Sequence, residues 1–177
     1  MAGRFAVVDA ANRFVRWTDR KTIHDEQLVH RSVHVLLHDR AGRLLVQRRH
    51  ATKQTWPRYW DTSCAGHVEE SDYLAGPDDA LDAVHAAVAA REVAEELGVS
   101  PPLELVARLG PVAGVHYEQI YLYRGTTDGP FTLQPDEVEE VRFVAAAELP
   151  GFLAREPVTA TLRWLVERDR SIATSES

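Results

Sequence analysis

The segment AAREVAEELGV, residues 89–99, places three glutamates in a short stretch rich in alanine. Alanine favours helix, and a glycine such as Gly98 commonly ends one. In a helix, residues three and four apart share a face, so Glu92, Glu95 and Glu96 are expected to lie together. Like charges at these spacings repel by about 0.2–0.5 kcal/mol per pair in an isolated helix. The segment therefore predicts a helix whose acidic face is either solvated or binds a cation.

The rest of the chain contains more strand than helix patterns. Apolar alternation predicts strands at residues 4–10, 29–39, 43–49, 59–68, 103–110, 115–125 and 139–144, with the second and third joined as a hairpin. Helices are expected at residues 76–98, 146–154 and 157–170. Because the strands cluster instead of alternating with helices, the pattern favours a mixed sheet covered by helices, of the α/β (α+β) class, over a βαβαβ dinucleotide-binding fold. We expect one domain over residues 1–170 and a flexible tail over 171–177.

The charge and cysteine content restrict the partners and the compartment. The 177 residues carry a formal net charge of −7, which argues against a broad basic surface for a nucleic-acid polymer or an anionic membrane. Cys64 is the single cysteine, so no internal disulfide framework can form. The first twenty residues lack the apolar core of a signal peptide, and no apolar run reaches the roughly 18 residues of a membrane span. A cytoplasmic protein is expected, and a homodimer stays open.

The acidic segment matches a known motif in more than its glutamates. REVAEELGV resembles the second half of the Nudix box, G-x5-E-x7-R-E-U-x-E-E-x-G-U, where U is aliphatic, and it fits at Arg91, Glu92, Val93, Glu95, Glu96, Gly98 and Val99. The resemblance implies the Nudix fold, an α/β/α sandwich around a mixed β-sheet. It also implies that Glu92, Glu95 and Glu96 hold Mg²⁺ or Mn²⁺, hard cations that prefer oxygen ligands. Arg91 would then orient one glutamate through a charged hydrogen bond.

The first half of the box is less regular. AGHVEE resembles its opening loop with Gly66 as the first glycine, which implies that the backbone carbonyl of Ala65 joins the metal. However, 24 residues separate Gly66 from Arg91 where the pattern has 13, so eleven residues are extra. Asp72 and Asp82 both stay open as the first acidic residue of the box. The stretch EESDYLAGPDD, residues 69–79 and called the extra segment below, combines charges, glycine and proline without apolar periodicity, so we expect it to face substrate or a partner and to contribute little to the core.

The stretch GRLLVQRRHATKQTWPRYWDTSCAGH, residues 42–67, is similar to type I isopentenyl-diphosphate isomerases, which share the Nudix fold. Those enzymes hold a metal with three histidines and two glutamates. The resemblance implies a second metal site formed by His24, His30, His67, His116 and Glu118. The alternative is that these histidines are ordinary polar residues of strands and loops.

The similarity fails at the cysteine that these isomerases use for proton transfer. In the register set by Gly66 and His67, its place is held by Ala65, and Cys64 lies one position earlier. A shift by one residue turns a strand side chain to the opposite face, so we expect Cys64 to be a small core residue. Together with the intact glutamates, this mismatch favours hydrolysis over isomerisation.

These observations predict a metal-dependent hydrolase that cleaves a diphosphate linkage in a small, nucleoside-diphosphate-type substrate. Arg48, Arg49 and Gly66 are expected to bind the substrate, and Arg91 and Glu118 to join the three glutamates in catalysis. The general base stays open, with Glu137, Glu139 and Glu140 as candidates. The first alternative is an isopentenyl-diphosphate isomerase in which Glu118 and Cys64 transfer protons. The second is a binding module that senses a nucleotide without turnover.

Overall fold

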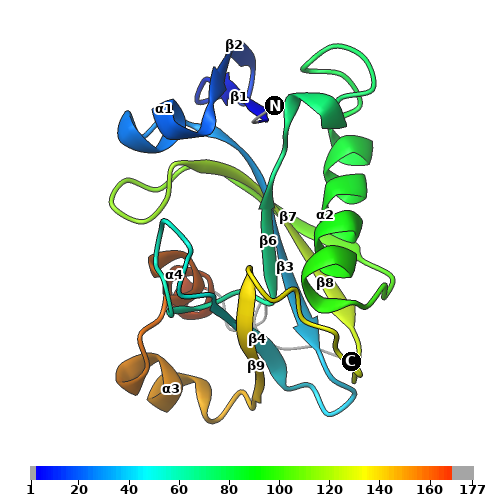
Figure 1. Cartoon of the computed structure of the whole chain (residues 1–177), viewed down its shortest axis with the longest axis vertical. Helices are drawn as coiled ribbons and strands as arrows, with labels where there is room; N and C mark the ends of the chain where they lie inside the picture. Colours follow the sequence, from blue (N-terminus) through cyan, green and yellow to red (C-terminus); the bar gives the residue numbers. More distant parts are fainter. Residues whose placement is uncertain (1–2, 169–177) are drawn as a thin grey trace.

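The computed structural model describes residues 3–168, in which nine strands form one mixed sheet with helices on both faces (Figure 1). The strands are β1 (Arg4–Val8), β2 (Phe14–Asp19), β3 (His30–His38), β4 (Leu44–Arg49), β5 (Trp60–Asp61), β6 (Cys64–His67), β7 (Glu104–Leu109), β8 (Glu118–Thr126) and β9 (Val138–Val144). The helices are α1 (Arg20–Asp25), α2 (Leu81–Leu97), α3 (Leu149–Arg155) and α4 (Ala160–Arg168), with a 3₁₀ turn, η1, at Glu70–Asp72. No helix in this part of the chain combines the length and apolarity needed to cross a bilayer.

Strand β3 organises the sheet. On one side it runs parallel to β8 over nine residue pairs, from His30 opposite Glu118 to His38 opposite Thr126. On its other side it meets β1, β6 and β4, all antiparallel. This combination gives the mixed sheet that the sequence predicts, and it places the start of β8 beside the start of β3.

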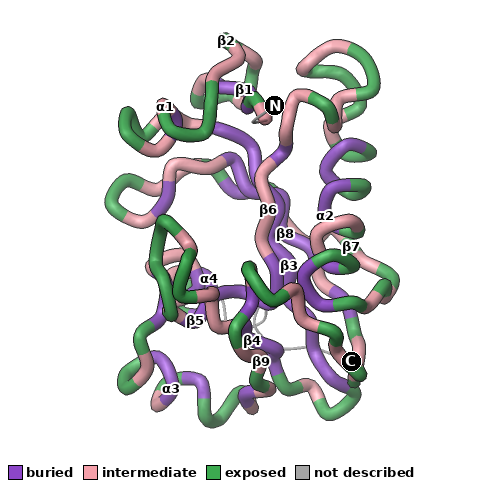
Figure 2. The backbone as a smooth tube through the Cα atoms, viewed as in Figure 1, coloured by how far each residue is buried: buried purple, intermediate pink, exposed green. Residues whose placement is uncertain are grey.

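Two apolar clusters cover opposite faces of the sheet, so the predicted α/β/α sandwich is confirmed. Alternate residues of β3, among them Val33 and Val35, pack beneath the buried side of α2. The intervening residue Leu36 lies on the other face, in a cluster with residues of α3 and α4 such as Phe152 and Leu162. Figure 2 shows β3 and the inner side of α2 as buried. The alternation of β3 therefore assigns each of its side chains to one of two layers.

Most predicted elements are present, with shifted bounds. The expected strand at residues 59–68 divides into β5 and β6, and the expected helix at 76–98 begins only at Leu81. It ends as predicted at Gly98, which adopts φ +68° and donates its N–H to the carbonyl of Ala94. Strand β2 and helix α1 are absent from the sequence-based prediction. The predicted tail at 171–177 lies outside the described residues.

The extra segment is largely exposed, with Leu74 85% exposed, but the expectation that it contributes little to the core is wrong at two points, Tyr73 and the contacts with Arg31. Arg31 of β3 has a fully buried side chain, and its guanidinium binds Asp78 at 2.6 Å and the hydroxyl of Tyr73 at 3.2 Å. It also donates to the carbonyl of Pro77 and, on the β1–β2 turn, to Asn12 at 2.6 and 2.8 Å. Tyr73 itself packs against the cluster beneath α2. The segment is therefore tied to the centre of the sheet by one buried cation.

Candidate active site

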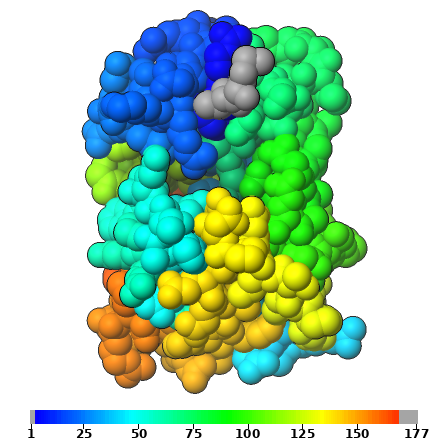
Figure 3. Space-filling view, viewed as in Figure 1, coloured from blue at the N-terminus to red at the C-terminus, as the bar shows by residue number. Residues whose placement is uncertain are grey.

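A cavity of about 570 Å³ lies over the part of the sheet that α3 and α4 leave uncovered. Its floor is the β3 face of His30, Ser32 and His34, which alternates with the residues beneath α2. Figure 3 shows the surface hollowed between the blue N-terminal region, the cyan loop after β4 and the green helix α2. Residues from all three regions line it: Arg20 and His24 from α1, Lys53, Thr55 and Trp56 from the loop, and the three glutamates of α2.

Helix α2 brings Glu92, Glu95 and Glu96 into the cavity wall as the spacing predicts. The helix approaches β6 very closely at Gly66. A Cβ atom added there would lie 2.4 Å from Cγ and Cδ of Glu92, far inside van der Waals contact. A larger residue at this position would displace the Glu92 side chain, and Gly66 itself also lines the cavity beside Ala65.

Arg91 bridges the two halves of the box. It donates from Nη2 to Oε1 of Glu92 at 3.0 Å and from Nη1 to Asp72. These contacts raise the pKa of the Arg91 guanidinium, chiefly through Asp72. The other candidate, Asp82, instead pairs with Arg108 at 2.6 Å on the surface. Five residues separate Gly66 from Asp72, as in G-x5-E, so Asp72 occupies the first acidic position and the extra residues follow it.

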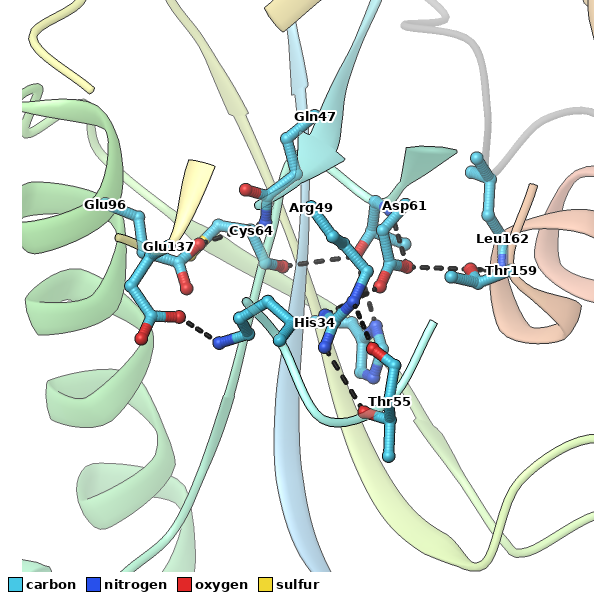
Figure 4. Close-up of polar contacts among 12 residues, drawn as sticks. His34, Gln47, Arg49, Thr55, Asp61, Cys64, Glu96, Glu137, Thr159 and Leu162 are labelled. Carbon is cyan, nitrogen blue, oxygen red and sulfur yellow. Dashed lines mark hydrogen bonds and ion pairs between the residues drawn. The ribbon is translucent and has the colours of Figure 1, made fainter. Parts of the chain in front are cut away.

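The electrostatics of the acidic wall favour a positive ligand. Burial raises the pKa of Glu92, and it raises the pKa of Glu96 to about 7. Hydrogen bonds from the Cys64 thiol and from Nε2 of Gln47, the latter at 3.0 Å, oppose that rise at Glu96 (Figure 4). Carboxylates with raised proton affinity in a buried wall are stabilised in the charged form by a cation.

The floor of the cavity holds a cluster of histidines. His30, His67 and Glu118 each offer one ligand atom, and these atoms lie within 4.8 Å of one another. The ring of His24 is 5.8 Å from that of His67 and 6.2 Å from that of His30. Nδ1 of His30 lies 2.8 Å from the carbonyl oxygen of Leu28, an arrangement that orients metal-binding imidazoles in many proteins. The structure thus brings together four of the five residues predicted for a second metal site.

The fifth, His116, lines the same cavity outside that group of three. Its ring packs edge-on against Trp164 of α4, with centroids 5.3 Å apart. Nδ1 of His116 accepts a hydrogen bond from the backbone N–H of Glu118 at 3.4 Å.

Glu118 is held by three neighbours. Oε2 accepts hydrogen bonds from Ser32 at 2.8 Å and from His34 at 3.0 Å, and Oε1 lies 3.7 Å from His67. Burial alone would raise the pKa of Glu118, but the bonds with His34 and His67 hold it well below its usual range. The same bond raises the pKa of His34 against the effect of its burial, whereas burial lowers the pKa of His67 to about 4. His67 is therefore a neutral imidazole at pH 7, the form that binds metal.

The two arginines predicted to bind substrate lie in different places. Arg49 lines the cavity, where its guanidinium is 3.3 Å from Asp61 and donates to the carbonyl of Thr55 at 3.1 Å (Figure 4). Arg48 points elsewhere and pairs with Glu140 at 3.6 Å. The loop after β4 also supplies Lys53, which the sequence patterns did not single out and which binds Glu137 at the cavity.

Cys64 is a core residue, as predicted. It is fully buried beneath α2, and burial raises the pKa of its thiol well above the usual value. Along β6 the side chains alternate, so Cys64 and Gly66 face α2, whereas Ala65 and His67 face the cavity floor. The thiol and Glu118 therefore lie on opposite sides of the strand.

Comparison with known proteins identifies relatives in sequence and in fold. Residues 28–165 match the NUDIX domain. The chain is 36% identical over 168 residues to an isopentenyl-diphosphate Delta-isomerase of Nocardia farcinica, covering 91% of this chain and 89% of that one. It is 28% identical over 155 residues to an uncharacterized Nudix hydrolase of Yersinia pestis, covering 81% and 73%. A crystal structure from Deinococcus radiodurans, 22% identical, covers 93% of this chain and 98% of its own with a TM-score of 0.74, which shows the same fold.

Proposed function

The chain belongs to the NUDIX domain family, and from this we propose a metal-dependent hydrolase that cleaves the diphosphate linkage of a nucleoside-diphosphate-type substrate. The comparisons confirm the predicted family, whose relatives include isomerases and hydrolases. They also confirm the predicted enzyme class, a Nudix hydrolase. The observation that carries the proposal is that one cavity contains both the acidic face of α2 and the cluster of His30, His67 and Glu118.

The residues present suit two kinds of cation. Glu92, Glu95 and Glu96 offer only carboxylate oxygens, which fit Mg²⁺ or Mn²⁺. His30 and His67 offer imidazole nitrogens beside Glu118, which fit a transition metal such as Mn²⁺ or Zn²⁺. The chemistry that such a cation supplies is charge neutralisation on the diphosphate and a lowered pKa of the attacking water.

The chain's own groups would bind and orient the substrate. Asp61 and Thr55 hold Arg49 at the cavity and engage one N–H of each guanidinium nitrogen, which leaves one N–H on each of Nη1 and Nη2 for phosphate oxygens. Trp56 lines the same cavity with 47% of its surface exposed, and its indole offers a flat face to a nucleobase. In hydrolysis, the oxygen of water bonds to phosphorus, the bridging P–O bond breaks, and the proton of water passes to a nearby base.

Isopentenyl-diphosphate isomerisation is the second candidate. The Nocardia farcinica relative and the cluster of His30, His67 and Glu118 favour it. Proton transfer on both sides of a prenyl double bond needs a second acid beside the substrate. Cys64 is turned away from the cavity floor and buried beneath α2, so it does not supply that acid. This placement supports hydrolysis.

The test is a turnover screen over nucleoside diphosphates and triphosphates, sugar nucleotides, dinucleotide cofactors and isopentenyl diphosphate. Glu95→Gln and Glu96→Gln each remove a charge and keep the shape, so the fold should persist while the rate falls about 100-fold or more. Unchanged turnover of both variants at saturating Mg²⁺ contradicts the proposal.

The histidine cluster has a separate test by metal analysis. After dialysis against a weak chelator, we expect one retained transition metal per chain and its loss in His67→Ala. His50→Ala is the matched control, since the ring of His50 contacts only the nearby Thr52 by hydrogen bonds and lies outside the residues that line the cavity. Metal-free parent protein, with full activity in His67→Ala, would restrict metal binding to the acidic face.

A further inference from the structure

Two buried histidines of the cavity have opposite protonation patterns. Nδ1 of His30 faces the carbonyl oxygen of Leu28 at 2.8 Å, and because a carbonyl only accepts, this nitrogen carries the proton. Nδ1 of His116 faces the backbone N–H of Glu118 at 3.4 Å, and because that group only donates, this nitrogen carries the lone pair. In neutral rings, Nε2 of His30 therefore carries a lone pair and can accept or bind metal, whereas Nε2 of His116 carries a proton and can donate.

Both Nε2 atoms are buried and have no hydrogen-bond partner within residues 3–168. His116 as a whole is only 5% exposed, and it lines the cavity. A buried donor without an acceptor is unfavourable, and because His116 lines the cavity, a ligand bound there can supply the missing oxygen. His30 lies in the cluster of potential ligand atoms, which suits its lone pair, whereas His116 lies outside it.

The ring of His116 is fixed in place before any ligand binds. Its backbone N–H donates to the carbonyl of Val112 at 3.0 Å, and its carbonyl accepts from the N–H of Val112 at 3.0 Å. The ring then packs edge-on against Trp164. A donor held in this way loses little conformational entropy when it binds an acceptor.

We propose that His116 binds substrate, through a hydrogen bond from Nε2–H to an acceptor oxygen of the diphosphate compound, and does not ligate metal. The inference rests on the proposed function, because it takes its acceptor from that substrate. The oxygen belongs either to a phosphate or to a hydroxyl of the organic group, and both accept from an N–H.

The first experiment reads the protonation pattern directly and needs no turnover. Long-range ¹H–¹⁵N spectra of the metal-free protein at neutral pH should show the proton on Nδ1 of His30 and on Nε2 of His116. Added Zn²⁺ should shift Nε2 of His30 and leave the proton on Nε2 of His116. Loss of that proton on zinc binding, or a proton on Nδ1 of His116, would overturn the proposal even if hydrolysis were established.

The second experiment separates substrate binding from metal binding. His116→Phe keeps the packing on Trp164 and removes the donor, so KM should rise about tenfold with unchanged metal content. His116→Gln keeps an N–H donor and should recover part of the loss, which a purely structural role would not predict. Inorganic diphosphate as a competitive inhibitor distinguishes the two sources of oxygen: its Ki rises with KM for a phosphate contact and stays constant for a hydroxyl contact.

The opposite results are equally clear. An unchanged KM in His116→Phe, or loss of the metal from it, would reject His116 as a substrate-binding residue. If the parent protein hydrolyses no diphosphate, the proposed function fails, while the spectra still decide which nitrogen of His116 carries the proton.

Discussion

Gln47 donates a hydrogen bond from Nε2 to Oε2 of Glu96 at 3.0 Å, and both side chains are buried. Gln47 belongs to β4 and Glu96 to α2, so the bond fixes the carboxylate to the sheet and not only to its own helix. An amide can donate without adding charge to the acidic wall. The bond therefore helps to hold Glu96 in the cavity wall.

Replacing Gln47 by leucine should weaken metal binding at the acidic face. The substitution keeps the approximate volume and removes the donor that orients Glu96. Partners of metal ligands typically change affinity by about 10–100-fold, so the Kd for Mn²⁺, measured by titration, should rise within that range. Gln119→Leu is the matched control, because Gln119 is also buried but donates to the carbonyl of Ala10. Equal Kd values in both variants would show that Glu96 needs no such support.

Cys64→Ala should retain diphosphate hydrolysis, since the thiol lies beneath α2 and only assists Glu96. Cys64→Ser keeps a donor to Glu96 and should resemble the parent more closely. Rates should be measured with the best hydrolytic substrate and with isopentenyl diphosphate. Isomerisation by the parent that disappears in Cys64→Ala would reverse the order of the two candidate functions.

Arg31→Met should destabilise the protein strongly. It removes the hydrogen bonds of the guanidinium to Asp78, to the carbonyl of Pro77 and to Asn12; because Asp78 is about half exposed and stays hydrated, we expect a loss of about 1.5–3 kcal/mol, typical of hydrogen bonds to a charged group. Chemical denaturation gives the loss in the free energy of unfolding. Arg13→Met removes an exposed ion pair with Asp9 and should cost at most about 1 kcal/mol. Similar losses in the two variants would mean that the extra segment is not anchored by Arg31.

His85 should make stability depend on pH in the acid range. Its side chain is fully buried and stacks on Tyr121 at 3.6 Å, and burial lowers its pKa from 6.5 to about 4. Because the folded pKa lies below the unfolded one, the neutral ring stabilises the fold fully above pH 6.5. That contribution is lost as the pH falls toward 4, by at most about 1.4 kcal/mol per pH unit.

His85→Phe keeps the stacking and cannot titrate, so it isolates this effect. The difference in unfolding free energy between parent and variant should change between pH 6.5 and 4 in favour of the variant. Other groups titrate in both proteins and cancel in the difference. A difference that is constant with pH would mean that His85 is protonated equally in the folded and unfolded chains.

Short-range sequence patterns predicted those elements and contacts that depend only on neighbouring residues. Alternation gave β3, β4 and β8, and spacing gave the shared face of Glu92, Glu95 and Glu96. Strand β2 is half exposed without clear alternation, and α1 has only six residues, too few for a helical period to appear.

The rest of the site depends on long-range pairing. His34 bonds to Glu118, 84 residues away, only because β3 and β8 run parallel in one register. The anchoring of the extra segment is equally non-local, since Arg31 looks like an ordinary strand residue until Pro77 and Asp78 are folded onto it.

The nine-pair register between β3 and β8 also restricts how this gene can change. His30 and His34 alternate with Val33 and Val35, so a single inserted or deleted residue within β3 would exchange the cavity floor with the apolar layer beneath α2. Such an event would remove the site and the core together, leaving no folded but inactive intermediate. Length changes should therefore be absent from β3 among homologues and be confined to connections such as the one before α2, where eleven residues have already been accommodated.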